Sequence, residues 1–468
     1  MAAGRVLAMA QPRDQGTATI GRIEDWLRQH EREAIVGLVA LAAALRVVLI
    51  ADAPSYGFVW DFYREGVAVL VTTGRLPVAA DCWQCYHPPL FYLAGWAPYR
   101  VGLWLGGPEV ADRLLSGLGL CAVSVLVWYG YRLLRLLGFS GAPLVGGVAL
   151  LLASPLLLFS SYGAEADALL AALLTAFLFH LVRACSRPEG MRLRDAVGVG
   201  LLAGAAMATK YSGLVALGTA GVVMMMRLGH DGLRGVRAGL VVLGVALAVG
   251  GWTYLDNYRT YGTPLHANGS ASEGLRLGAI ANRGGYDFTS FRVQELRALF
   301  GPRPEPGPLT GFPVYRSVLT SLHAQAWSDM SFFSLPSRHG DPSQPYRSRR
   351  PPVNLVMTLV LLGLVPMALA LVGVVVTWRL LAWWPLAAIA GVTLIAYVAW
   401  FLPQEAWALK TKYISVLVPV QAAYAMAGGR WLGQRRRWLG WVVAAAVGGL
   451  TGCAFVYQFA FANGRLAL

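Results

Sequence analysis

The sequence predicts an all-α polytopic integral membrane protein with about eleven transmembrane helices and two large extracytoplasmic loops. Two observations on composition support this class: 56% of the residues are hydrophobic and only 13% are charged, whereas soluble domains carry about 25% charged residues. The third observation is that apolar runs recur near the length of about 20 residues that a helix needs to cross a bilayer. Most of the chain is therefore expected to contact lipid or other helices.

The apolar runs are taken in chain order. Predicted spans lie at 34–51, 112–133, 142–161, 164–183, 195–209, 211–227, 238–255, 353–377, 381–402, 412–428 and 438–461. Two of them, 195–209 and 211–227, are short and are separated by Lys210. They form either a tight helical hairpin or a partly re-entrant element, which is tolerated only where protein or water lines it.

Arginine placement predicts how these spans are oriented. Arginines occur in the N-terminal tail and in every second connecting loop, at 134–141, 184–194, 228–237, 378–380 and 429–437. The short opposite loops at 162–163 and 403–411 contain no basic residue except Lys410. Because basic residues favour cytoplasmic loops, the N-terminus is expected in the cytoplasm. The protein is expected to lie in a bacterial inner membrane. The net charge of +15 then reflects topology rather than nucleic-acid binding, since no basic stripe with interleaved aromatic residues occurs on a polar segment.

The span pattern divides the chain into four regions. Residues 1–33 are expected to form a cytoplasmic tail with an amphipathic helix, 34–255 an N-terminal transmembrane catalytic module that includes the outer loop 52–111, 256–352 an extracytoplasmic loop or lid, and 353–468 the C-terminal transmembrane helices. Within the first outer loop, the apolar stretch from Pro88 to Gly107 is expected to lie at the interface as a helix. The long loop is rich in Gly and Pro, which predicts irregular structure.

The first outer loop contains the first candidate site residues. Asp61 is flanked by aromatic residues, and a carboxylate beside apolar rings ionises at a higher cost, so it can act as a general base or as a metal ligand. Glu65 is a second candidate acid, and either residue could instead be a solvated loop acid. His87 precedes two prolines that impose an extended approach to the next helix, so it is expected to contact substrate or to serve as a packing residue.

Cys82 and Cys85 form a CxxC pair in the same loop. With His87 they would supply only three ligands, whereas a structural zinc site uses four. A disulfide in an oxidising compartment, or two free thiols, is therefore expected in place of a metal site.

A second acidic pair lies between two spans, at Glu165 and Asp167. Ionisable side chains at membrane depth are costly and usually face a cavity. Residues two apart do not share a helix face, so one acid is expected to face inward, and Asp167, which lies deeper, is the better candidate. If a divalent metal ion is used, Asp61 and Asp167 are its expected ligands; no other cofactor is required.

The chain has only three lysines, and all lie at the expected outer ends of spans. Lys210 is followed by Tyr211, and Lys412, which lies two residues after Lys410, is followed by Tyr413. Such lysines are expected to bind phosphate or anionic lipid headgroups, although snorkelling to lipid phosphate is the general alternative.

Taken in order, these motifs resemble the GT-C superfamily of membrane glycosyltransferases, especially the branch of protein O-mannosyltransferases and aminoarabinose transferases. The motifs that carry the resemblance are Asp61, Gly74 to Pro77, His87 to Tyr92, Ala111 to Arg113, Asp167, Gly204 to Gly213, Asn257 to Pro264, and Lys412 with Tyr413. Each motif is weak alone, and their order along most of the chain gives the resemblance its specificity.

The resemblance implies a glycosyltransferase that moves a monosaccharide from a polyprenyl-phosphate donor to an acceptor hydroxyl, with inversion, on the extracytoplasmic face. It implies Asp61 as the base, Asp167 as second acid or metal ligand, and Lys210 and Lys412 as phosphate contacts. Many members have an acidic pair in the first loop, whereas here Phe62 follows Asp61. The expected partners are the lipid-linked donor, membrane lipids and an acceptor glycan, lipid or protein.

Two other functions fit a protein of this class. A glycolipid flippase or transporter without catalysis would place charged residues deep in its spans, as Arg46 is placed here. An oligosaccharide polymerase or ligase would have a large outer loop late in the chain, and the loop at 256–352 is compatible with that function.

Overall fold

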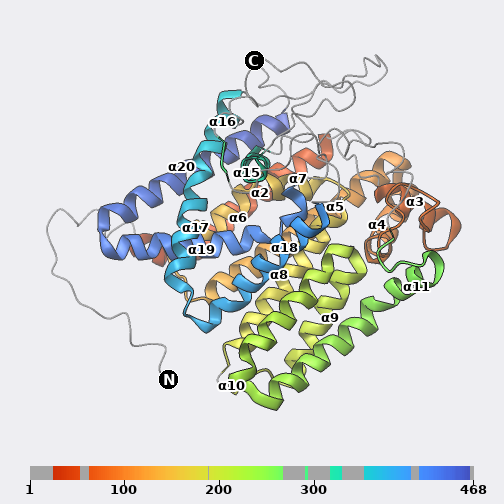
Figure 1. Cartoon of the computed structure of the whole chain (residues 1–468). Helices are drawn as coiled ribbons and strands as arrows, with labels where there is room; N and C mark the ends of the chain where they lie inside the picture. Colours follow the sequence, from red (N-terminus) through yellow and green to blue (C-terminus); the bar gives the residue numbers. More distant parts are fainter. Residues whose placement is uncertain are drawn as a thin grey trace.

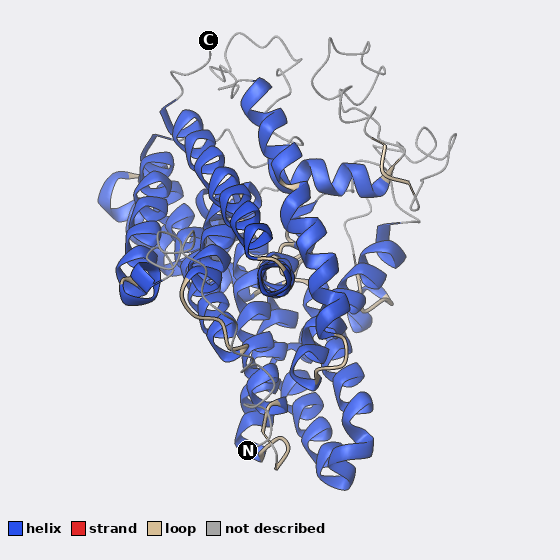
Figure 2. Cartoon of the chain, turned by 90° about the vertical axis from the view of Figure 1, so that its left-hand side faces the viewer, coloured by secondary structure: helices blue, strands red, loops and turns tan. Residues whose placement is uncertain are grey.

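The computed structural model describes residues 25–52, 63–187, 189–266, 290–292, 317–328, 353–401 and 411–463. Within these ranges the regular elements are helices, and none is drawn as a strand (Figure 2). The helices pack side by side, with α3, α4 and α11 gathered at one edge and α17, α19 and α20 at the other (Figure 1). The predicted all-α class is confirmed.

The helices of the N-terminal part are α2 (Glu31–Asp52), α3 (Tyr63–Thr73), α4 (Leu90–Gly106), α5 (Pro108–Leu136), α6 (Ala142–Ala153), α7 (Pro155–Tyr162), α8 (Ala166–Cys185), α9 (Leu193–Thr209), η2 (Tyr211–Gly213), α10 (Leu214–Ala246), η3 (Leu247–Gly251) and α11 (Trp252–Tyr261). The helices of the C-terminal part are α15 (Val318–Ser328), α16 (Val353–Leu362), α17 (Leu364–Thr377), η4 (Leu381–Trp383), α18 (Trp384–Phe401), η6 (Thr411–Ile414), α19 (Leu417–Arg435) and α20 (Arg437–Asn463).

Eight helical segments of the described chain are long and apolar enough to cross a membrane, so the protein is an integral membrane protein. They are Glu31–Ala51, Pro108–Leu136, Ala166–Cys185, Tyr211–Leu228, Gly232–Tyr261, Asn354–Thr377, Leu381–Ala399 and Arg437–Phe459. The predicted count of about eleven is not confirmed. The run predicted at 142–161 breaks into α6 and α7 at Ser154, and α9 contains only 17 residues. The predicted span 412–428 is not confirmed either, since its helix, α19, has Arg430 and Arg435 in its second half.

Loops that were predicted to share one side of the membrane meet at one end of the bundle. Glu31, at the start of α2, pairs with Arg135 at 3.0 Å and accepts a hydrogen bond from the Gly141 amide. Arg430, near the end of α19, donates to the Gly138 carbonyl. The contacts group the tail, the 134–141 loop and the end of α19, as the Arg pattern predicted.

A tight turn joins α9 to α10. Lys210 lies between them in an extended conformation, and the η2 turn follows. A Cβ atom on Gly213 would lie 2.1 Å from the Ala206 carbonyl oxygen, so only glycine allows this approach of the two backbones. Helices α9 and α10 thus meet in a tight turn, and how 195–227 sits in the membrane stays a prediction.

A buried arginine stabilises the break between α6 and α7. Ser154 has an extended conformation there, which interrupts the helical hydrogen bonding. The Leu152 carbonyl accepts hydrogen bonds from Arg46, at 3.4 Å, and from Gln458, at 3.0 Å. Arg46, the deepest charged residue noted in the sequence, therefore has a structural role at a helix break.

Part of the long loop between α11 and α16 is helical. Helix α15 packs against α7, α16 and η6, and its Val318, Ala324 and Trp327 are at most 5% exposed. The sequence predicted irregular structure here because Gly and Pro dominate the flanking segments. Those segments, 267–289, 293–316 and 329–352, lie outside the described residues.

Candidate functional site

A buried ion pair lies at the centre of the candidate site. Lys210 Nζ donates hydrogen bonds to both carboxylate oxygens of Asp167, each at 2.9 Å. The two side chains are 8% and 1% exposed. A buried charge is stable only when an opposite charge and hydrogen bonds compensate it, so each of these groups fixes the position of the other.

The local structure explains why these two residues meet. Asp167 lies in the first turn of α8, where the helix dipole favours a negative charge. Its helix follows the end of α7 and Gly163, which pack so closely on α5 that a Cβ on Gly119 would lie 2.9 Å from the Ser160 and Gly163 carbonyl oxygens. Lys210 caps the end of α9, where the extended backbone directs it toward α8.

Aromatic rings enclose the lysine. The ammonium lies 4.6 Å from the ring centre of Tyr413 and 5.6 Å from that of Tyr63. Both distances are within the range of cation–π attraction. Tyr413 comes from η6 and Tyr63 from the start of α3, so the cation connects segments from both halves of the chain.

His87 lies in the same cluster. Its ring stacks on Tyr63 at a centroid distance of 5.4 Å and lies 4.2 Å from the ring of Tyr86. The loop before it is closed by a disulfide between Cys82 and Cys85. Of the two alternatives for the CxxC pair, the structure contains the disulfide.

Tyr92 fixes the other side of this loop. Its hydroxyl donates to the Gln84 carbonyl, and burial raises the pKa of Tyr92 well above its usual value. The hydroxyl therefore stays protonated and keeps this hydrogen bond across the physiological range. The loop that holds His87 is thus fixed both covalently and by a buried tyrosine.

Tyr211 connects three segments around the site. Its hydroxyl accepts a hydrogen bond from Asn257 Nδ2 at 2.8 Å. The Tyr86 and His266 carbonyl oxygens lie 2.7 and 2.9 Å from the same hydroxyl, whose one proton they share. The tyrosine thus ties η2 to α11 and to the loop that contains His87.

A second ion pair borders the site. Arg64, next to Tyr63, lies 2.7 Å from an Asp112 carboxylate oxygen, and that side chain is 7% exposed. In the following loop, Arg75 binds Asp81 through two hydrogen bonds of 2.7 Å. The Arg75 guanidinium holds the pKa of Asp81 below its usual value, with a further contribution from the Val78 amide. The loop from α3 to α4 therefore keeps a fixed charge pattern at neutral pH.

The structure brings together five of the residues predicted for the site: His87, Asp167, Lys210, Tyr211 and Tyr413. Glu165 is the residue before α8, and Glu65 is exposed on α3. Asp61 and Lys410 lie outside the described residues, as does the side chain of Lys412.

The described residues do not form a metal site around Asp167. Both of its oxygens accept hydrogen bonds from Lys210, and a neighbouring ammonium opposes a divalent cation. No group of three or more His, Cys, Asp or Glu side chains with metal-binding geometry occurs among the residues placed in the structure. A metal at Asp167 would require the ion pair to open.

Sequence reasoning gave no role to Tyr63, Asn257 or Arg64. Tyr63 is two residues after Asp61, and Asn257 opens one of the motifs that resembles the GT-C superfamily. The sequence offered one signal for Tyr63 and Asn257: each lies in or next to a motif that was already singled out. Their roles depend on contacts between distant segments, which the local pattern does not contain.

Comparison with known proteins supports the fold. Neither a protein-family model nor a curated protein matches the sequence. The archaeal oligosaccharyltransferase AglB from Archaeoglobus fulgidus, in complex with zinc and sulfate, is similar at a TM-score of 0.53 and 14% identity, over 90% of this chain and 53% of AglB. Its complex with an inhibitory peptide and a dolichol-phosphate gives a TM-score of 0.51 and 13% identity, over 94% of this chain and 56% of AglB.

ArnT from Cupriavidus metallidurans in the apo state gives a TM-score of 0.48 at 17% identity, over 92% of this chain and 75% of ArnT. The chain spans about half the length of AglB, so the AglB comparison concerns the part that the two proteins share. At this identity the similarity establishes the fold. Over the part that aligns, the chain therefore shares the fold of AglB, a helical membrane fold of the kind that the resemblance of its motifs predicted.

Proposed function

We propose that this protein is a membrane glycosyltransferase that takes a monosaccharide from a polyprenyl-phosphate donor and transfers it to an acceptor hydroxyl on the extracytoplasmic face. The observation that supports this proposal most strongly is the buried Lys210–Asp167 pair within an aromatic cluster, in a chain whose fold is that of AglB. AglB has been solved with a dolichol-phosphate bound, and a lipid-linked phosphate is the ligand that a cation at a membrane surface would recognise.

In the proposed mechanism Lys210 stabilises the leaving phosphate. A phosphate ester is a good leaving group, so it needs positive charge more than a general acid. Asp167 orients the ammonium, while Tyr63 and Tyr413 shield it from water. Lys412 and Lys410 are further proposed phosphate contacts, and His87 with Tyr211 would border the sugar.

Asp61 is the proposed base. The acceptor oxygen forms a bond to the anomeric carbon while the bond from that carbon to the phosphate oxygen breaks, and the acceptor proton passes to the Asp61 carboxylate. Attack from the face opposite the phosphate inverts the anomeric configuration. Glu65, four residues further along the chain, is the second candidate acid.

Transfer in vitro tests this function. Purified protein in lipid nanodiscs is given polyprenyl-phosphate mannose, glucose, galactose and arabinose together with a cell-envelope glycolipid fraction as acceptor. The wild-type protein is expected to release polyprenyl phosphate from one of these donors, and Asp61→Asn to lose at least 99% of that activity. Consumption of no donor, or full activity of Asp61→Asn, would overturn the proposal.

Cysteine labelling tests the proposed orientation. A single cysteine introduced at Leu319, which is 45% exposed on α15, is expected to react with a membrane-impermeant maleimide in spheroplasts. A cysteine replacing Arg135 is the matched site at the other end of the bundle, and it should react only after lysis. The reverse pattern would place the site in the cytoplasm.

A further inference from the structure

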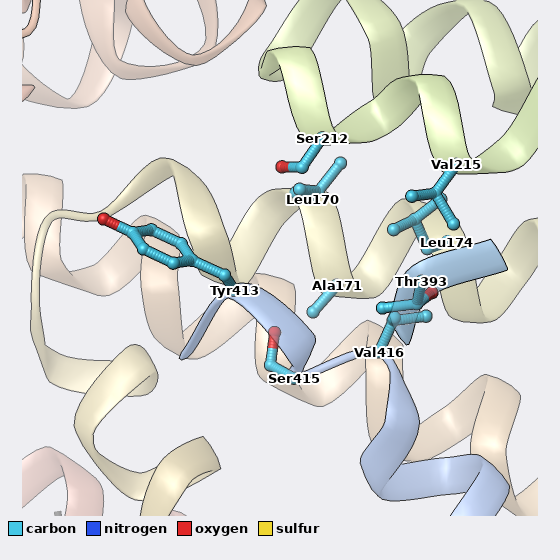
Figure 3. A pocket seen from close by; sticks show the side chains of 9 residues that line it. All are labelled: Leu170, Ala171, Leu174, Ser212, Val215, Thr393, Tyr413, Ser415 and Val416. Carbon is cyan, nitrogen blue, oxygen red and sulfur yellow. The ribbon is translucent and has the colours of Figure 1, made fainter. Parts of the chain in front are cut away.

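A small cavity lies near the Lys210–Asp167 pair, one helical turn further along α8. Its lining comes from α8, η2, α10, α18, η6 and the residues after η6 (Figure 3), and the lining residues are Leu170, Ala171, Leu174, Ser212, Val215, Thr393, Tyr413, Ser415 and Val416. Leu170 and Ala171 follow Asp167 by three and four residues, so they lie on the same face of α8 one turn deeper. Tyr413 lines the cavity and also contacts the Lys210 ammonium.

Two hydroxyl groups in this lining have no hydrogen-bond partner among the described residues. They are Ser212 Oγ and Thr393 Oγ1, and both atoms are buried. Thr393 is 4% exposed. Leaving a buried hydroxyl unpaired is unfavourable, and native structures contain few such groups.

Three buried threonines in α8, α17 and α20 behave differently, whereas Thr219 in α10, like Thr393, has no hydrogen-bond partner among the described residues. The hydroxyls of Thr175, Thr377 and Thr451 each donate to the carbonyl four residues earlier in the same helix, at 2.7 Å. That local bond is the usual solution for a threonine within a helix. Thr393 lies in α18 and makes no such bond, so its hydroxyl remains available to the cavity.

The size of the cavity restricts its occupant. It measures about 10 Å³, which is room for one oxygen atom of water size. The lining contains no cationic side chain, so it offers nothing to a phosphate. One small group that both donates and accepts hydrogen bonds fits this space, which describes a single hydroxyl of a ligand or one water molecule.

We propose that this cavity is a hydroxyl-recognition subsite, in which one hydroxyl of the transferred sugar binds Ser212 and Thr393. The inference rests on the proposed function, since it places the sugar beside the phosphate that Lys210 would hold. Tyr413 is the shared wall of the two sites, so a sugar linked to that phosphate lies next to the cavity. The subsite would therefore select donors by one hydroxyl position.

Substitution of Thr393 combined with deoxy donors tests the subsite. The best of the polyprenyl-phosphate sugars named above is compared with its monodeoxy analogues, each lacking one ring or exocyclic hydroxyl. The wild-type protein should disfavour one analogue by about three- to tenfold in kcat/KM, the effect of one neutral hydrogen bond. Thr393→Val should lower kcat/KM for the complete donor by the same factor and leave that analogue unaffected. Ser212→Ala should behave similarly.

Thr451→Val is the matched control, because Thr451 is a buried threonine whose hydroxyl is bonded within its own helix. It should change kcat/KM equally for all donors. Without donor, Thr393→Val should unfold at the same temperature as the wild type or higher, since the substitution removes an unpaired buried hydroxyl.

Three outcomes would overturn the subsite alone: equal loss with every donor, the same discrimination in Thr451→Val, or a lower unfolding temperature of Thr393→Val without donor. The last outcome would mean that the cavity holds a structural water only. Transfer from no donor would overturn the proposed function and the subsite together.

Discussion

The Lys210 ammonium donates to both carboxylate oxygens of Asp167 at 2.9 Å, and both side chains are almost fully buried. Removing one partner of such a pair leaves an uncompensated buried charge, which costs about 3–5 kcal/mol. Lys210→Gln and Asp167→Asn should therefore each lower the free energy of unfolding by this amount. Thermal unfolding in detergent measures the change.

The double variant Asp167→Asn/Lys210→Gln separates stability from activity. Its neutral side chains can still hydrogen-bond to each other, so most of the lost stability should return. Donor turnover should remain below 1% of wild type, because the cation that would hold the phosphate is missing. A double variant with restored turnover would mean that the pair is purely structural.

Substitutions of Tyr413 test whether the aromatic rings around Lys210 contribute to donor binding. Cation–π contacts contribute about 0.5–2 kcal/mol, and the ring lies 4.6 Å from Lys210 Nζ. Tyr413→Leu should raise KM for the donor about tenfold, whereas Tyr413→Phe retains the ring and should stay within about twofold of wild type. Equal effects of the two substitutions would assign the role to the hydroxyl.

Gly213 tests how the turn between α9 and α10 positions Lys210. A Cβ there would lie 2.1 Å from the Ala206 carbonyl oxygen, so Gly213→Ala should cost about 1–3 kcal/mol through overpacking and should reduce turnover. On α10, a Cβ added to Gly221 would meet no other atom within 4 Å. Gly221→Ala should therefore be neutral or stabilise by up to about 1 kcal/mol. Thermal unfolding of the two variants decides this prediction.

The disulfide tests how the loop before His87 is held. The disulfide closes a loop of only a few residues, so it contributes about 2 kcal/mol at most to the free energy of unfolding. The loop also positions the Tyr86 carbonyl, which accepts a hydrogen bond from the Tyr211 hydroxyl. The Cys82→Ser/Cys85→Ser variant should lose most of its turnover with a small decrease in unfolding temperature. Reductant should inhibit the wild-type protein and have no effect on this variant.

His323 makes the docking of α15 sensitive to pH. Burial lowers the pKa of His323 below 6.5, and the hydrogen bond to the Val360 carbonyl at 2.8 Å only partly offsets this effect. Since the undocked state takes up the proton more readily, docking is fully stable above about pH 6.5 and weakens as the pH falls below that value. A cysteine replacing Ala324, which is 1% exposed, should therefore react with maleimide faster at pH 5 than at pH 7.5 once each rate is divided by the thiolate fraction at that pH.

Two variants control for this pH effect. The His323→Gln background removes the titrating ring and should abolish the difference between the two pH values, after correction for the thiolate fraction. A cysteine at the exposed Leu319 should follow the thiolate fraction alone. Since α15 packs near Tyr413 through Leu322, undocking of this helix should also lower donor turnover at acidic pH.

Hydropathy and the spacing of arginines were sufficient for the helical class and for most spans, because crossing a membrane imposes a length and a composition on each segment. They could not predict the break at Ser154, which depends on Arg46 and Gln458 from distant helices. They also did not predict α15, since its burial results from contact with α7 and α16 rather than from its own pattern.

For the site, the order of motifs grouped His87, Asp167, Lys210, Tyr211 and Tyr413, and the structure places these residues together. From the sequence, Asp167 and Lys210 were expected to act as separate functional groups, and their direct pairing was not predicted. Which helix ends face each other is decided by packing, such as the contact of Gly119 with the turn before α8. The role of Asp61 remains a prediction.

The aromatic cluster around Lys210 draws on residues from near both ends of the polypeptide, since Tyr63 and Tyr413 contact the same ammonium. During synthesis the ribosome adds Tyr63, the loop of Cys82 and Cys85, Asp167 and Lys210 long before it reaches Tyr413. A nascent chain thus holds a partly formed, open cluster until η6 has been made. Truncated products that end before η6 therefore lack one wall of the site.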